Sequence, residues 1–330
     1  MTQSGGLPIT TPVFTEPGDG LVAIAPGCFV TPETLGACQF PDQVHFLQVL
    51  AAVQRYPDAY VSGLSALIFR RIPVVSAPAT VSLLHHSRHG LSRDGDAHFY
   101  RRSSSTPRLA HKLHAGTRDI LCVRADFALL DALRWSITEL SDAVAVTDSV
   151  LRVTKLKKKD LLASYQKQCA DVPRNRRILI DRALTLAIPG VDSIRESQMR
   201  MELYARGYPP PLVHPQIFDV DGYTHLATPD LYYPDARVAL EYDGAGKHRG
   251  DFGDLPADSL TIHHTRADRL TTRGVRVIHV NNARFKSGAW VNDLDDALGN
   301  HLGPLPAKQV RGGIPAWENK RGPRWKMDSY

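Results

Sequence analysis

The sequence lacks several features that would place it in a specialised class of protein. It has no uninterrupted apolar run of about 18 residues, roughly the length that a membrane-spanning helix needs. Its first residues, MTQSGGLPITTP, have neither a basic stretch nor an apolar core, so we expect no secretory signal. The four cysteines are scattered without a C-x-x-C pair, which argues against a disulfide framework or a zinc knuckle. These absences favour a cytoplasmic protein with no membrane partner.

The overall composition is that of a globular protein. Apolar residues make up 43% of the chain and charged residues 22%, which excludes collagen-like, fibrous and wholly disordered proteins. At about 100–200 residues per domain, a chain of 330 residues predicts two domains with sizeable cores.

Positive charge is concentrated in one segment of the chain. Residues 151–195 contain eleven Lys or Arg and four Asp, a net charge of +7, whereas the whole chain carries +6. Such a basic stripe is typical of a surface that binds a polyanion, most often nucleic acid, although it is also compatible with a solvated helix face. The candidate DNA-binding residues here are Lys155, Lys157, Lys158, Lys159, Arg174, Arg176 and Arg177. A second basic stretch closes the chain, and its Gly and Pro content predicts a flexible tail that either binds phosphates or is disordered.

Hydrophobic periodicity and turn residues predict an α/β protein. We divide the chain into a strand or hairpin segment (1–41), an α+β domain (42–150), a basic helical connector (151–190), a mixed sheet flanked by helices (191–300) and the flexible tail (301–330). In the mixed-sheet domain a helix is followed by strands at 213–220, 224–233 and 237–243, then by a helix and a last strand near 275–281. Helices are expected to cover this mixed sheet.

Carboxylates gather on one predicted hairpin. Its arms, 228–233 and 237–243, pair in one of two registers, which place Asp230 opposite either Leu240 or Glu241. In the second register Asp230 joins Glu241 and Asp243 on one face, because side chains alternate along a strand and opposed residues share a face. Two like charges about 5 Å apart repel by about 3 kcal/mol at an effective dielectric constant near 20.

This crowding is tolerated if the acids share a proton or hold a cation. Carboxylate oxygens suit Mg²⁺ (or Mn²⁺), and a water bound to such a cation can attack a phosphodiester. The pattern therefore predicts a metal-dependent phosphodiesterase. The alternative is structural: Asp243-Gly244 is a turn dipeptide and Glu241 an exposed strand residue.

The segments SIRESQMR (193–200), PD (229–230), VALEYDG (238–244) and HTRADRL (264–270) occur in an order and spacing that resemble a known family. It is the very-short-patch-repair-like endonuclease domain of the restriction-endonuclease-like, PD-(D/E)XK superfamily. The resemblance covers about residues 190–285, a third of the chain.

The resemblance implies a role in the active site for four residues of this sequence. Asp230 and Glu241 would bind the metal, and Glu196 would complete the pocket from the preceding helix. His248 would lie near the scissile phosphate as a general acid or as a stabiliser of the leaving group. The structural alternative for Glu196 is a capping box with Ser193, and the two roles can coexist. His248 is otherwise a surface histidine.

One position departs from the superfamily pattern. Asp243 stands two residues after Glu241, where the superfamily has a lysine, and it matches the subgroup that has Glu-x-Asp-Gly. Lys247, Arg266 or His248 would then supply the missing positive charge, and Lys247 and Arg266 are also candidate DNA contacts. Arg266 can instead form a surface ion pair with Asp268.

Two functions follow. The first is a metal-dependent DNA endonuclease or nickase. The alternative is a catalytically inactive DNA-binding regulator of the antitoxin type that keeps the nuclease fold as a scaffold.

The region before the connector favours the alternative through a weaker resemblance. DAYVSGLSALIFRRIP (58–73) and RADFALLDALRW (124–135) are similar to AbiEi-type antitoxins and transcriptional regulators, which implies a toxin or other protein partner. Members of that family usually begin with a DNA-reading domain made of helices, and residues 1–41 contain too little helix-forming sequence to build one. The sequence leaves the choice between monomer and dimer open.

Overall fold

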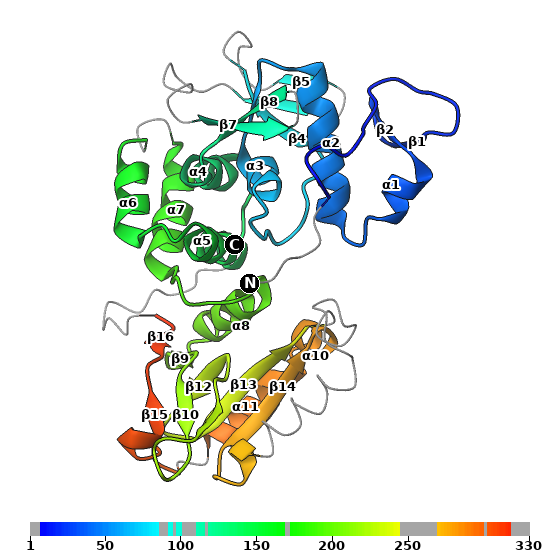
Figure 1. Cartoon of the computed structure of the whole chain (residues 1–330). Helices are drawn as coiled ribbons and strands as arrows, with labels where there is room; N and C mark the ends of the chain where they lie inside the picture. Colours follow the sequence, from blue (N-terminus) through cyan, green and yellow to red (C-terminus); the bar gives the residue numbers. More distant parts are fainter. Residues whose placement is uncertain are drawn as a thin grey trace. The chain divides into compact units, whose positions relative to one another are not determined.

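The protein has two compact units, residues 1–198 and residues 199–330. The computed structural model describes residues 7–85, 92–94, 97–100, 110–115, 118–168, 172–244, 269–299 and 302–317. Both units combine helices with a mixed sheet, which confirms the α/β fold class (Figure 1). The units divide within one continuous helix, α8 (Ile194–Ala205), later than the boundary near residue 190 expected from the sequence.

The first unit contains the predicted hairpin and a six-stranded sheet. Strands β1 (Val22–Ala25) and β2 (Cys28–Val30) form the hairpin, followed by a short helix, α1 (Pro32–Gly36), that the sequence did not predict. The sheet has the order β5-β6-β4-β3-β8-β7 and mixes parallel with antiparallel pairs. Its strands are β3 (Tyr60–Val61), β4 (Val81–Leu84), β5 (Ser92–Asp94), β6 (Ala97–Tyr100), β7 (Ala110–Ala115) and β8 (Arg118–Val123).

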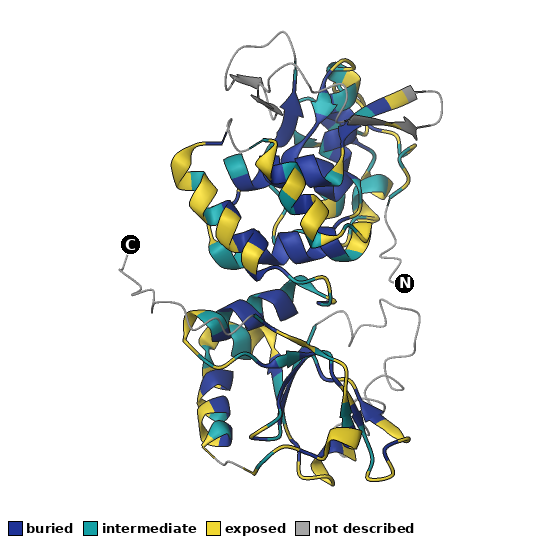
Figure 2. Cartoon of the chain, turned by 90° about the vertical axis from the view of Figure 1, so that its left-hand side faces the viewer, coloured by how far each residue is buried: buried dark blue, intermediate teal, exposed yellow. Residues whose placement is uncertain are grey.

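Helices complete the first unit. They are α2 (Pro41–Arg55), α3 (Gly63–Phe69), α4 (Ala125–Trp135), α5 (Leu140–Thr154), α6 (Lys158–Gln166) and α7 (Arg174–Leu186). Figure 2 shows them with buried faces in dark blue and exposed faces in yellow.

The basic segment is part of this unit and not a connector. Helix α6 packs on α4, and α7 packs on α4 and α5. The apolar residues Leu161, Ile180 and Leu184 are fully buried, while most of the lysines and arginines lie on the outer faces. The prediction of a separate connector is wrong because both helices are amphipathic and bury their apolar stripes.

The second unit is built on two sheets. The five-stranded sheet has the order β14-β13-β12-β9-β16, with β13 and β14 parallel and the other pairs antiparallel. The three-stranded sheet has the order β11-β10-β15. Their strands are β9 (Leu212–Val213), β10 (Gln216–Phe218), β11 (His225–Ala227), β12 (Leu231–Tyr233), β13 (Val238–Asp243), β14 (Arg276–Asn281), β15 (Val310–Arg311) and β16 (Ile314–Pro315).

The carboxylate hairpin adopts the second of the two expected registers. Leu231 pairs with Leu240, and Tyr233 pairs with Val238. Continuing this register by one residue places Asp230 opposite Glu241. The two acids therefore occupy facing positions on neighbouring strands.

Two strands that the sequence predicts as continuous are interrupted at prolines. The first breaks between β9 and β10 at His214-Pro215, and the second breaks between β11 and β12 at Thr228-Pro229-Asp230. Proline has no N–H to donate to a sheet, and His214 has a positive φ of 47°. At each break the chain leaves one sheet for the other, and the His214 N–H donates to the Asp230 carbonyl at 3.2 Å. The two interruptions thus lie side by side.

The two faces of the five-stranded sheet are packed differently. On one face Tyr232 and Ala239 join the cluster that also contains Ile217 and Leu226 of the three-stranded sheet. The other face is covered by α10 (Asn282–Ser287) and α11 (Ala289–Leu298), where Phe285 packs edge-on against Tyr242.

The prediction of a flexible tail is wrong for residues 302–317. A 3-10 turn, η3 (Ala307–Gln309), leads into β15 and β16, which pair with β10 and β9. The Arg200 guanidinium is fully buried and donates to the Ala316 carbonyl at 2.7 Å. Backbone pairing and this buried contact hold the segment, and residues 318–330 lie outside the described residues. No helix among the described residues is long and apolar enough to span a membrane.

Candidate functional site

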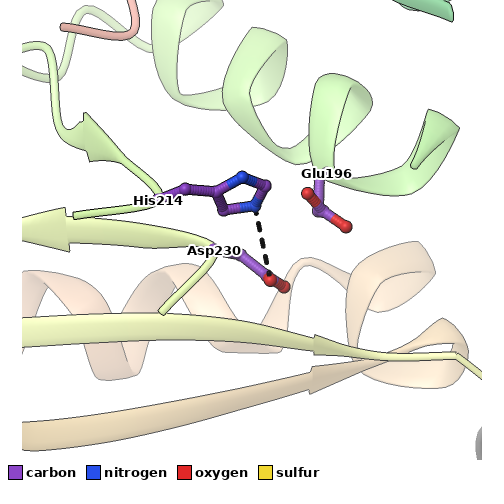
Figure 3. A group of neighbouring side chains, drawn as sticks. All are labelled: Glu196, His214 and Asp230. Carbon is purple, nitrogen blue, oxygen red and sulfur yellow. Dashed lines mark ion pairs between the residues drawn. The ribbon is translucent and has the colours of Figure 1, made fainter. Parts of the chain in front are cut away.

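Three side chains converge where the two interrupted strands meet α8. Glu196, His214 and Asp230 each offer one ligand atom, and these atoms all lie within 4.8 Å of one another. Figure 3 shows Glu196 on the helix and the other two residues on the adjoining strand ends. Two carboxylates and one imidazole form a donor set able to hold a divalent cation.

Glu196 is fixed by hydrogen bonds at the start of α8. Ser193 Oγ accepts from the Glu196 N–H at 3.2 Å and donates to Glu196 Oε1 at 2.8 Å. The Asp192 N–H donates to Oε2 at 3.1 Å. The residue is only 6% exposed. The capping role anticipated from the sequence is therefore present, and it coexists with membership of the cluster.

The helix itself carries Glu196 toward the strands. Glu196, Met199, Arg200 and Leu203 follow the spacing of one helix face, and all four are buried. One turn separates Glu196 from Arg200, whose guanidinium is bonded to Ala316 in the second unit. Because an α-helix is stiff over one turn, this contact also fixes the position of Glu196.

Asp230 is positioned by both neighbouring strands. Its carbonyl accepts from the His214 N–H, and its Oδ2 accepts from the Tyr242 N–H at 2.7 Å. Its other oxygen, Oδ1, lies 3.9 Å from His214 Nε2. The His214 and Asp230 side chains are 20% and 15% exposed. One oxygen of Asp230 is thus used by the sheet and the other faces the cluster.

The electrostatics of the cluster favour a bound cation. Two carboxylates no more than 4.8 Å apart repel by about 3 kcal/mol at an effective dielectric constant of 20. A divalent ion between them reverses the sign of that interaction. The same site can alternatively be neutralised by protonation.

Glu241 and Asp243 lie on β13 outside this group of three. Glu241 pairs in register with His279 of β14, and Asp243 Oδ2 lies 3.1 Å from His279 Nδ1. This hydrogen bond is the main reason why the pKa of His279 is raised above its usual value. The metal pair expected from the sequence was Asp230 with Glu241, whereas the described cluster joins Asp230 to Glu196 and His214.

Three predicted site residues lie outside the described residues, namely Lys247, His248 and Arg266. They belong to the segment between β13 and the helical end at 269–271.

The predicted DNA-binding residues divide into two groups. Three of them bind backbone carbonyl groups: Lys158 reaches the Thr185 and Ala187 oxygens at 2.6 and 3.0 Å, Arg176 the Ile137 oxygen at 2.8 Å and Arg177 the Val172 oxygen at 2.9 Å. These three have a structural role that the charge count did not reveal. Exposed side chains remain at Lys155, Lys157, Lys159 and Arg174.

Sequence reasoning missed two histidines. His214 carries no motif, and its place in the cluster follows from the pairing of β9 with β12, which no local pattern specifies. His279 lies in a strand that the sequence predicts correctly, and the parallel register of β13 with β14 brings it to Asp243. His279 could have been found by aligning the two predicted strands in parallel, which places His279 beside Glu241 and Asp243.

Comparison with known proteins adds no assignment: no protein-family model matches the sequence, and no curated protein is significantly similar to it.

Proposed function

We propose that this protein is a metal-dependent DNA endonuclease or nickase whose cation is held by Glu196, His214 and Asp230. The observation that carries the proposal is the convergence of these three side chains within 4.8 Å, next to the carboxylate hairpin. The mixed sheet flanked by helices agrees with the fold that the resemblance implies.

The donor set fits a divalent cation, because two carboxylates supply charge and an imidazole supplies a neutral ligand. Such a cation supplies a bound water of lowered pKa and offsets charge on the leaving oxygen. Asp230 Oδ1 and the Glu196 carboxylate would hold the cation. The Tyr242 N–H fixes the Asp230 carboxylate, and the Ser193 hydroxyl and the Asp192 N–H fix that of Glu196. The Asp243–His279 pair lies on β13 and β14, and the hydrogen bond to Asp243 raises the pKa of His279 above its usual value.

Binding of DNA is supported by charge. Residues 151–195 carry a net charge of +7, and the exposed lysines Lys155, Lys157 and Lys159 are free of the carbonyl contacts that Lys158 makes. Contacts of this kind bind the phosphate backbone without sequence preference and weaken with salt.

The test is a nicking assay on supercoiled plasmid with Mg²⁺ or Mn²⁺. The wild-type protein is expected to nick the plasmid only with a divalent cation, and Asp230→Ala is expected to abolish nicking. Asp235→Ala is the matched control, because Asp235 is an exposed acid in the turn of the same hairpin. Nicking that persists in Asp230→Ala, or that fails in the wild-type protein with every divalent metal, would overturn the proposal.

The second candidate is a catalytically inactive DNA-binding regulator of the antitoxin type, with a toxin as its protein partner. One observation favours it: Asp243 stands at the superfamily's lysine position and is engaged by His279, and neither β13 nor β14 contains a lysine. DNA retention that falls between about 50 and 200 mM salt, without any nicking, would support this function.

A further inference from the structure

We infer that His214 makes this site select a first-row transition-metal cation such as Mn²⁺ over Mg²⁺. The inference rests on the proposed function, because it concerns the cation of the same site. Its basis is the presence of an imidazole nitrogen in a group otherwise made of carboxylates.

The separation of the two strand residues suits a shared cation. His214 Nε2 and Asp230 Oδ1 are 3.9 Å apart, beyond the 2.7–3.2 Å typical of a hydrogen bond. Two donors each about 2.1 Å from one ion lie about 3.0 Å apart when adjacent and about 4.2 Å apart when opposite. The observed 3.9 Å lies between these two distances and nearer to that of opposite ligands. A shift of about 0.3 Å would therefore bring the two side chains to the spacing of opposite ligands of one ion.

The backbone holds His214 in this position. Its positive φ of 47° and the following Pro215 interrupt the strand, and its N–H is bonded to the Asp230 carbonyl. The imidazole is largely enclosed, with a side chain only 20% exposed. A ligand nitrogen is thus presented by a rigid turn and does not need to be ordered when a cation binds.

A carboxylate oxygen can accept a hydrogen bond and still be a metal ligand, because it has two lone pairs. Asp230 uses Oδ2 for the Tyr242 N–H, so Oδ1 faces the cluster. Each oxygen of Glu196 accepts one hydrogen bond from the start of α8, and a carboxylate oxygen has two lone pairs. Among the described residues, the group of three donors therefore includes one nitrogen.

This donor set distinguishes between cations. Mg²⁺ prefers oxygen ligands in near-ideal octahedral geometry and gives up its waters reluctantly, so it gains little from an imidazole. Mn²⁺ accepts both carboxylate and imidazole, and the affinity for nitrogen ligands rises further along the series to a maximum at Cu²⁺. Removing the nitrogen should therefore weaken Mn²⁺ binding much more than Mg²⁺ binding.

The experiment is calorimetric titration of the full chain with MnCl₂ and with MgCl₂, without DNA. The informative variant is His214→Asn, since asparagine tolerates positive φ and offers an amide oxygen in place of the nitrogen. His225→Ala is the control, because His225 is an exposed histidine that bonds Thr228 instead. Melting of the metal-free proteins verifies that each variant is folded, with His214→Gln as a second variant should His214→Asn not fold.

We expect the wild-type protein to bind Mn²⁺ at least about tenfold more tightly than Mg²⁺, and His214→Asn to lose about tenfold in Mn²⁺ affinity with little change for Mg²⁺. His225→Ala should behave as wild type. Equal affinities of the wild-type protein for the two cations, or an equal loss of both in His214→Asn, would overturn the inference. Selective Mn²⁺ binding without plasmid nicking would uphold the preference for Mn²⁺ and refute the endonuclease. Nicking by a protein that binds both cations equally would uphold the endonuclease and refute the preference.

Discussion

Replacing Asp230 with asparagine is expected to stabilise the metal-free protein while removing its response to divalent cations. The carboxylates of Asp230 and Glu196 lie within 4.8 Å, which gives a repulsion of about 3 kcal/mol at an effective dielectric constant of 20. The substitution removes this repulsion but weakens the hydrogen bond from the Tyr242 N–H at 2.7 Å, at a cost of about 1 kcal/mol. The net gain in the free energy of unfolding is about 2 kcal/mol.

Urea denaturation in a chelator and in Mn²⁺ measures both effects. A cation at 100 times its dissociation constant should stabilise the wild-type protein by about 2.7 kcal/mol, and Asp230→Asn by nothing measurable. Asp235→Asn, in the exposed turn of the same hairpin, should match wild type in both buffers. A lower stability of Asp230→Asn than of wild type in chelator would contradict the repulsion, and stabilisation of this variant by Mn²⁺ would contradict the role of Asp230 as a ligand.

Three further predictions concern single residues. Burial lowers the pKa of His45 to about 4, whereas the pKa of histidine in the unfolded chain is about 6.5. As the pH falls below 6.5 the unfolded chain takes up a proton that the folded protein does not, so the free energy of unfolding should fall by about 3 kcal/mol by pH 4. Acid titration of His45→Gln should lack this loss. Lys158→Met should lower the melting temperature, because the Lys158 ammonium donates to two carbonyl groups. Lys159→Met should leave the melting temperature unchanged and weaken retention on a heparin or DNA column, because the Lys159 side chain is exposed. The opposite pattern would contradict these two roles. Ser193→Ala should cost about 1 kcal/mol through loss of the helix cap while Glu196 still binds Mn²⁺, and calorimetry showing unchanged stability would refute the capping role.

Local patterns predicted most of the elements of the second unit. The alternation of apolar and acidic residues in β13 defined its faces, and the hairpin register was limited to two choices, of which the structure has the one that pairs Leu231 with Leu240. The interruptions at Pro215 and Pro229 were not predicted, although a proline inside a strand pattern is itself a sign of a break.

The site required pairings between distant segments, and this is where sequence reasoning stopped. His214 reaches Asp230 because β9 pairs with β12, and Asp243 reaches His279 because β13 runs parallel to β14. No local periodicity encodes the partner of a strand. In the same way, the positive charge of Lys158 was evident from the sequence, but its carbonyl partners 27 and 29 residues away were not.

Anomalous diffraction from crystals grown with Mn²⁺ would show whether Glu196, His214 and Asp230 hold one divalent cation. We expect a peak at the manganese absorption edge about 2.1–2.2 Å from His214 Nε2, Asp230 Oδ1 and a Glu196 oxygen. A peak coordinated by Glu241 and Asp243 without His214, or a cluster that binds no manganese, would contradict it.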